Sequence, residues 1–260
     1  MNVILEYINK SKEIAETVSL QEREIKKAAK WFAQTIVSGR MVHVFGSGHS
    51  RMMVEEMWPR YGSFPGFNPI VELSLSFHNL VVGANGQRQA MFLENVSGFA
   101  NRILRNFDLK EDDCALIISS SGCNIVPIEM AEEFQKRNIK VVAILSAQHS
   151  TQSISKRKDG KKLSDFADVI LDTGAPVGDA MIKIPKLDTP VGPGSSVGGI
   201  ILINCIKVEV ARLLTEAGHP LIVLTAAAIV GTEKATALFE SAYDEHAHRL
   251  AELYKNVGNS

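Results

Sequence analysis

The sequence of residues 41–50 reads MVHVFGSGHS, and it joins an apolar run to a short loop of small residues. Met41 to Phe45 have the length and apolar character of a buried strand, and Gly46 to Ser50 lead into an expected helix at 51–58. The first N–H groups of a helix have no partner within it, and its N-terminal end carries partial positive charge. A loop of glycines and serines at that place therefore predicts an anion site.

A second loop of the same kind follows another apolar run. Cys114 to Ile118 form an expected strand, Ser119-Ser120-Ser121-Gly122 follow directly, and Asn124 stands where it can cap a helix or donate to a ligand. In open α/β sheets, ligands bind beyond the carboxyl ends of the strands, near a switch in strand order. The two loops predict one crevice that holds the phosphate of a small molecule, and the alternative is two unrelated tight turns.

The remaining pattern predicts an α/β protein with a mostly parallel five-stranded sheet. Residues 3–38 have the apolar spacing of two amphipathic helices, and 140–145 is a nearly unbroken aliphatic run. Apolar strands that alternate with helices indicate a parallel sheet covered on both faces. The other expected elements are strands at 70–75 and 169–171, helices at 89–107, 125–137, 195–217 and 233–256, and a long Pro- and Gly-rich loop at 174–194.

The composition is that of an ordinary globular protein. The 260 residues are 45% hydrophobic and 22% charged, with a formal net charge of −1, which favours neither a nucleic-acid nor a membrane-surface partner. The three cysteines have no paired spacing, as expected for a reducing compartment. No apolar stretch is long enough to predict a membrane span. We therefore expect a cytoplasmic protein.

The first loop also invites a dinucleotide interpretation. Gly46-Ser47-Gly48 has the first two glycines of that fingerprint, but Arg51 occupies the place of the third. A large side chain there opposes close packing of helix and strand. An NAD-dependent enzyme therefore stays an alternative, although the sequence matches the dinucleotide-binding motif poorly.

Several titratable residues lie near the first loop in the sequence. Glu55 and Glu56 are adjacent on the helix that the loop begins, so at most one of them faces the crevice. Arg60 follows Glu56 by four residues and shares its helix face. His49 in the loop and His78 after the second expected strand are candidate ligand-binding or acid–base groups.

Three segments resemble the SIS (sugar isomerase) domain family, of which phosphoheptose isomerase is a branch. They are 45–50 (FGSGHS), 55–61 (EEMWPRY) and 119–122 (SSSG). The resemblance extends loosely from about residue 20 to about residue 215, and the chain looks most like uncharacterised sugar isomerases of that family. It implies a single three-layer αβα domain over 1–260, with an N-terminal helical extension at about 1–38 and a C-terminal helix at about 233–256.

The resemblance also implies roles for individual residues. Glu56 matches the family's catalytic base, Arg60 matches the arginine that follows it, and His78 falls near a family histidine. The expected catalytic residues are Glu56 and His78. The expected phosphate- and substrate-binding residues are Gly46, Ser47, Gly48, His49, Ser50, Arg60, Ser119, Ser120, Ser121, Gly122 and Asn124.

Two departures from the family pattern bear on metal binding. Met52 stands where the family has a histidine four residues before the catalytic glutamate, and Asn204-Cys205 stand near the place of its catalytic histidine. In the family, these two positions supply zinc ligands and the acid–base partner of the glutamate. We therefore expect no metal and no cofactor.

The resemblance implies a protein that binds a phosphorylated sugar and isomerises aldose to ketose, with Glu56 moving a proton through an enediol and His78 or His49 assisting. Two alternatives remain open: a phosphosugar sensor without turnover, and a sugar-phosphate lyase or etherase that begins with the same proton abstraction. Apolar stripes on the N-terminal helices predict a homodimer or homotetramer.

Overall fold

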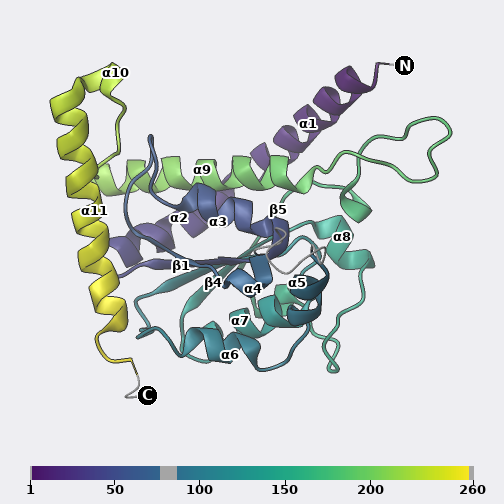
Figure 1. The fold of residues 1–260 in the computed structure, drawn as a ribbon, viewed down its shortest axis with the longest axis horizontal. Helices are drawn as coiled ribbons and strands as arrows, with labels where there is room; N and C mark the ends of the chain where they lie inside the picture. Colours follow the sequence, from purple (N-terminus) through teal and green to yellow (C-terminus); the bar gives the residue numbers. More distant parts are fainter. Residues whose placement is uncertain (1, 77–86, 258–260) are drawn as a thin grey trace.

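The computed structural model describes residues 2–76 and 87–257. Its centre is a parallel sheet of five strands in the order β2-β1-β3-β4-β5 (Figure 1). The strands are β1 (Val42–Gly46), β2 (Phe67–Ile70), β3 (Cys114–Ile118), β4 (Lys140–Leu145) and β5 (Val169–Asp172). Because β2 and β3 flank β1 on opposite sides, the strand order reverses between β1 and β3.

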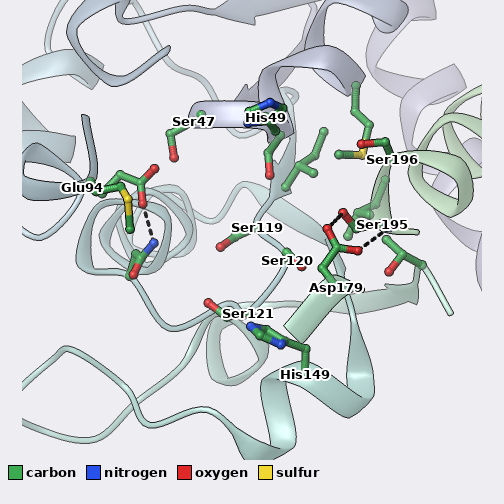
Figure 2. Close-up of a pocket in the computed structure, with 18 of the residues that line it drawn as sticks. Ser47, His49, Glu94, Ser119, Ser120, Ser121, His149, Asp179, Ser195 and Ser196 are labelled. Atoms are coloured by element: carbon green, nitrogen blue, oxygen red, sulfur yellow. Dashed lines mark hydrogen bonds between the residues drawn. The ribbon is translucent and has the colours of Figure 1, made fainter. Parts of the chain in front are cut away.

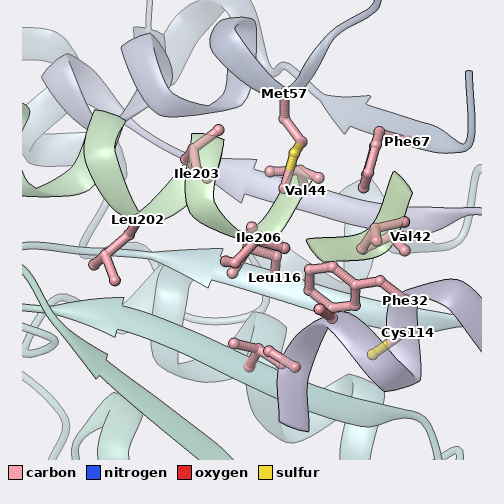
Figure 3. Packing of buried hydrophobic residues seen from close by; sticks show 14 of the residues in the cluster. Phe32, Val42, Val44, Met57, Phe67, Cys114, Leu116, Leu202, Ile203 and Ile206 are labelled. Atoms are coloured by element: carbon pink, nitrogen blue, oxygen red, sulfur yellow. The ribbon is translucent and has the colours of Figure 1, made fainter. Parts of the chain in front are cut away.

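Each face of the sheet is covered by its own hydrophobic core. Alternate residues of a strand point to opposite faces, so Val42 and Leu116 join one core, whereas Phe45 and Ile117 join the other. Figure 3 shows the first core, in which Phe32 and Ile203 from two helices lie over the strands. The expected three-layer α/β architecture is confirmed.

Two groups of helices form the outer layers. The first core receives residues from α1 (Val3–Ser19), α2 (Glu22–Val37), α3 (Arg51–Met57) and α9 (Ser195–Glu216). The second receives residues from α4 (Leu73–Ser76), α6 (Phe99–Leu104), α7 (Ile125–Gln135) and the 3-10 helix η3 (Leu163–Phe166). The other helical segments are η1 (Gly48–Ser50), α5 (Arg88–Leu93), α8 (Ala147–Gln152), η4 (Val177–Asp179), α10 (Ala227–Val230) and α11 (Thr232–Tyr254). Over the described ranges, no helix has both the length and the apolar character to cross a bilayer.

Two boundaries differ from the sequence prediction. The strand expected at 70–75 is β2, which ends at Ile70, and α4 follows it. Pro69 lies inside β2, and an edge strand tolerates a proline because one side of its backbone needs no partner. The helix expected at 89–107 is two helices, because Gly98 begins α6 with a φ of 82°, in the left-handed region.

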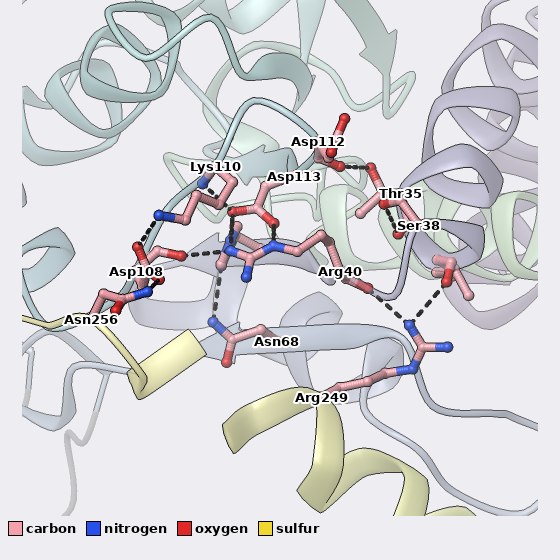
Figure 4. Close-up of polar contacts among 12 residues, drawn as sticks. Thr35, Ser38, Arg40, Asn68, Asp108, Lys110, Asp112, Asp113, Arg249 and Asn256 are labelled. Atoms are coloured by element: carbon pink, nitrogen blue, oxygen red, sulfur yellow. Dashed lines mark hydrogen bonds and ion pairs between the residues drawn. The ribbon is translucent and has the colours of Figure 1, made fainter. Parts of the chain in front are cut away.

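A buried polar network joins the amino ends of the strands (Figure 4). Asp113 accepts hydrogen bonds from Arg40 Nε at 2.7 Å and Nη2 at 2.9 Å, and its Oδ2 lies 3.2 Å from His43 Nε2. Asn68 lies 3.0 Å from His43 Nδ1 on the far side of the ring. Burial opposes ionisation of Asp113, but the bonds from His43 and Arg40 outweigh it and hold the pKa of this carboxyl below its ordinary value.

The start of α9 approaches the sheet unusually closely, because it contains two glycines. A Cβ on Gly198 would lie 1.9 Å from the carbonyl oxygen of Thr173, and one on Gly199 would lie 2.0 Å from Met53 Sδ. Neither position has room for a side chain. The two glycines thus bring Ser195 and Ser196, in the first turn of α9, to the carboxyl edge of the sheet.

We predict that Asp113→Asn lowers the free energy of unfolding by about 3–5 kcal/mol, because it leaves the buried Arg40 charge without the carboxylate that neutralises it. Urea denaturation at neutral pH measures the loss. Since the folded pKa of Asp113 is lowered, its contribution is complete above the ordinary Asp pKa of about 3.9 and is lost as pH falls through the lowered value. The control is Glu216→Gln. Glu216 forms an exposed ion pair with Arg212, and loss of this pair costs at most about 1 kcal/mol of unfolding free energy. Equal losses in both variants would contradict the assignment.

We predict that Gly198→Ala destabilises the protein by about 1–3 kcal/mol, because the new methyl group pushes α9 away from Thr173. Val208→Ala on the same helix is the control, since Val208 is 71% exposed and its truncation changes stability by about 0.5 kcal/mol at most. Thermal unfolding of both variants is the measurement. An unchanged Gly198→Ala variant would show that α9 does not pack this closely.

Candidate functional site

A cavity of about 260 Å³ lies at the carboxyl ends of β1 and β3, where the strand order reverses. Three serine-containing segments form its walls: 47–50, 119–121 and 195–196 (Figure 2). They come from distant parts of the chain, and the parallel sheet brings them together because all its strands end on this edge. The cavity is therefore at the place where open α/β sheets bind ligands.

The first loop turns sharply enough to present its side chains to the cavity. A Cβ on Gly46 would lie 2.8 Å from the carbonyl oxygen of Ser50, so only glycine allows this turn. The N–H of Ser50 donates to the carbonyl of Ser47 at 3.0 Å and closes the turn. His49 Nδ1 lies 2.8 Å from the Gln87 amide nitrogen, which holds the ring at the rim.

The second loop wraps around the start of α7. The hydroxyl of Ser119 accepts from the Gly122 N–H at 3.3 Å, and that of Ser121 accepts from the Cys123 N–H at 3.2 Å. The hydroxyl oxygen of Ser120 is buried and has no hydrogen-bond partner in the described part of the chain. With Asn124 as the N-cap of α7, the loop sets hydroxyl and N–H donors around the positive end of a helix dipole.

The far wall holds residues that the sequence did not identify as a site. Asp179 accepts from the N–H groups of Gly194 at 2.9 Å and Ser195 at 2.7 Å, and from the Ser195 hydroxyl at 2.6 Å. His149 Nδ1 accepts from the Gly178 N–H at 2.8 Å. An Nδ1 that accepts leaves the hydrogen of the neutral ring on Nε2, so Nε2 is the donor of His149.

Glu94 is the other residue of the cavity that sequence reasoning missed. It is the C-cap of α5 and only 8% exposed, and its carboxylate accepts hydrogen bonds from the side chains of Asn124 and Ser47. Burial raises the pKa of this carboxyl above its ordinary value despite those two bonds. No periodicity or motif in the sequence distinguishes Glu94 from a surface acid.

Glu56 lies outside this cavity and faces α9. Its carboxylate accepts from Arg60 Nη1 at 2.8 Å and Asn204 Nδ2 at 3.2 Å, and Lys207 Nζ is 3.6 Å away. Burial opposes ionisation, but the bonds from Arg60 and Asn204 and the Lys207 charge outweigh it and lower the pKa of Glu56. Asn204 in turn lines a larger apolar groove between α1, α2 and α9.

The structure thus gathers most, but not all, of the expected binding residues. Those that line the cavity are Ser47, Gly48, His49, Ser50, Ser119, Ser120, Ser121 and Asn124. Gly46 and Gly122 shape the two loops without lining it, Glu56 and Arg60 lie beside α9, and His78 lies outside the described residues. The roles expected of these residues stay predictions.

Across residues 2–76 and 87–257, no group of three histidine, cysteine or acidic side chains is arranged to hold a metal ion. The described lining of the cavity also contains neither lysine nor arginine. Within that described lining, the groups able to hold an anion are hydroxyl and N–H donors and the starts of helices.

Comparison with known proteins places the chain among its relatives. The chain is 36% identical over 205 residues to the UPF0309 protein BH3325 of Halalkalibacterium halodurans, a match that spans 79% of this chain and 82% of the relative. It is 31% identical over 258 residues to the UPF0309 protein Teth39_1980 of Thermoanaerobacter pseudethanolicus, spanning 97% and 98%.

Among solved structures, a phosphoheptose isomerase from Francisella tularensis matches with a TM-score of 0.51 and 17% identity, over 80% of this chain and 96% of that one. At this identity the match supports the fold. The family model described as a SIS domain matches residues 6–146, more than half of the chain. This protein, with its parallel sheet and paired serine loops, therefore belongs to the SIS domain family.

Proposed function

We propose that this protein binds a phosphorylated sugar in the cavity between β1 and β3 and interconverts its aldose and ketose forms. The observation that carries the proposal is the convergence of the loops 47–50 and 119–122 at the reversal of strand order. The fold is also that of a phosphoheptose isomerase. Because one fold can carry many activities, the proposal rests on the geometry of the site.

The second loop is the better place for the phosphate group. It combines the hydroxyls of Ser119 and Ser121 with the start of α7, an 11-residue helix. The opposite wall suits a polyhydroxy chain, since Asp179 and His149 offer acceptor and donor atoms there. A phosphate at one end and hydroxyl groups at the other are the features of a sugar phosphate.

Aldose–ketose isomerisation needs one group that moves a proton between C2 and C1 and another that stabilises charge on the carbonyl oxygen. The family resemblance assigns the proton transfer to Glu56, with His78 or His49 as its partner. The same abstraction begins a lyase or etherase reaction, and a sensor would bind the sugar phosphate without performing it. Assembly as a dimer or tetramer and a location in the cytoplasm stay predictions.

We predict that a sugar phosphate raises the melting temperature of the protein, whereas the matching free sugar and NAD do not. A panel of pentose, hexose and amino-sugar phosphates in a thermal-shift assay supplies the measurement. The variant Ser119→Ala/Ser121→Ala weakens binding at least about tenfold, since each hydroxyl bond to a charged group contributes about 1.5–3 kcal/mol.

Ser241→Ala, at an exposed site on α11, is the control and leaves the ligand-induced shift unchanged. A shift produced by NAD but by no sugar phosphate would reject the proposal in favour of a dinucleotide site. The protein is then incubated with the sugar phosphate that raises its melting temperature, and proton NMR follows the mixture. An isomerase forms the corresponding ketose or aldose, whereas a sensor leaves the sugar phosphate unchanged.

A further inference from the structure

We propose that Glu94 is the carboxylate that transfers the proton in this cavity, and that His149 Nε2 donates to the carbonyl oxygen of the substrate. This inference rests on the proposed function and identifies the residues that perform it. Both residues line the cavity, both lie outside the motifs of the two serine loops, and Figure 2 shows them on different walls.

Glu94 occupies the junction of the two loops. Its carboxylate accepts from Ser47 in the first loop and from Asn124 at the end of the second. A Cβ on Gly48 would lie 3.7 Å from Glu94 Oε1, so the first loop passes directly beside the carboxylate. A ligand that contacts Ser47 and Asn124 therefore lies next to Glu94.

Asp179, Glu56 and Glu94 have different surroundings. Asp179 accepts three short hydrogen bonds from the start of α9, which fix its position and favour a positioning role. Glu56 is held by the cations Arg60 and Lys207, which favour its ionised form and reduce its basicity. Glu94 accepts hydrogen bonds from two neutral donors, which stabilise its negative charge less than cations would.

The surroundings of Glu94 suit a general base. Burial raises its pKa, and its place at the C-terminal end of α5 adds the negative end of a helix dipole. A base is most effective when its pKa approaches the working pH, and enzymes raise the pKa of glutamates by burial for this purpose. By the same argument, the lowered pKa of Glu56 makes it a weaker base.

His149 has the complementary property of a fixed donor. The Gly178 N–H occupies Nδ1 and keeps the hydrogen on Nε2, so the neutral ring can polarise a carbonyl group. The residue is held at the end of β4, since its own N–H donates to the Ser146 hydroxyl at 3.1 Å. The donor therefore needs no rearrangement before reaction.

Every proton and electron pair of the proposed isomerisation can be followed. The Glu94 carboxylate takes the C2 proton of the aldose, the C2–H electrons form the C1=C2 bond of an enediol, and O1 takes a proton from His149 Nε2. The O2 hydroxyl then returns its proton to Nε2 and becomes the ketone oxygen, while Glu94 delivers its proton to C1. No oxidant, reductant or metal is consumed.

We predict that Glu94→Gln slows exchange of the substrate C2 hydrogen in D2O by about 10²–10⁴-fold, the usual contribution of a general base. The substrate is the sugar phosphate identified by thermal shift, and proton NMR follows the exchange. Glu94→Gln keeps the ligand-induced thermal shift, because Gln retains the length and an acceptor oxygen. The matched control is Glu55→Gln, which removes an exposed carboxylate on α3 and should leave exchange normal.

Glu56→Gln distinguishes this assignment from the one that the family resemblance implies. We expect Glu56→Gln to exchange at least about tenfold faster than Glu94→Gln. His149→Gln lowers kcat with little change in KM, since its donor acts on charge that develops in the transition state. Normal exchange in Glu94→Gln would overturn the inference while leaving the proposed function intact. A wild-type protein that neither binds nor exchanges any sugar phosphate would overturn both.

A stability measurement tests the environment of Glu94 without any substrate. Because the folded pKa of Glu94 is raised, the wild-type protein loses stability as pH rises from the ordinary Glu value of about 4.3 through the raised value. We predict that the melting temperature of Glu94→Gln relative to wild type increases over that window. The other titratable groups of the described lining, His49, His149 and Asp179, are common to both proteins. A constant difference would show that Glu94 is not buried as an acid.

Discussion

The whole candidate site depends on one constraint of the sheet, namely that β2 and β3 pair with opposite edges of β1. The chain leaves β1 in one direction and β3 in the other, so the loops at their carboxyl ends separate and leave a space between them. Because all five strands are parallel, the loops that follow β4 and β5 reach the same edge. This topology therefore produces a cavity whose walls come from separate segments between residues 47 and 196.

Close packing then determines the shape of this space. Gly198 and Gly199 let the start of α9 contact Thr173 and Met53, and Asp179 holds that start through three hydrogen bonds. The buried network around Asp113 lies at the opposite, amino ends of the strands. The sheet is thus braced at one edge by ionic contacts, and the other edge is left for polar loops and a ligand.

The electrostatic differences among the acids come from packing and not from residue type. Glu56 and Glu94 have the same side chain. Glu56 lies beside two cations, Arg60 after the end of α3 and Lys207 on α9, whereas Glu94 lies beside neutral donors of the two loops. The two carboxyl pKa values therefore shift in opposite directions, which supports the role in proton transfer that we propose for Glu94. The groove beside Asn204 and the exposed apolar residues of α1 are two further places where the described chain exposes apolar surface.

Local patterns were enough to predict the strands β1, β3, β4 and β5, both serine loops and the family, because buried apolar runs and glycine-rich turns are short-range signals. It misplaced β2, where Pro69 hides an edge strand, and it joined α5 to α6 across Gly98. Only the tertiary structure brought Glu94, His149 and Asp179 to the cavity and took Glu56 away from it. The physical reason is that helix direction and burial depend on contacts between segments more than a hundred residues apart, such as that of Glu56 with Lys207, and no local pattern records them.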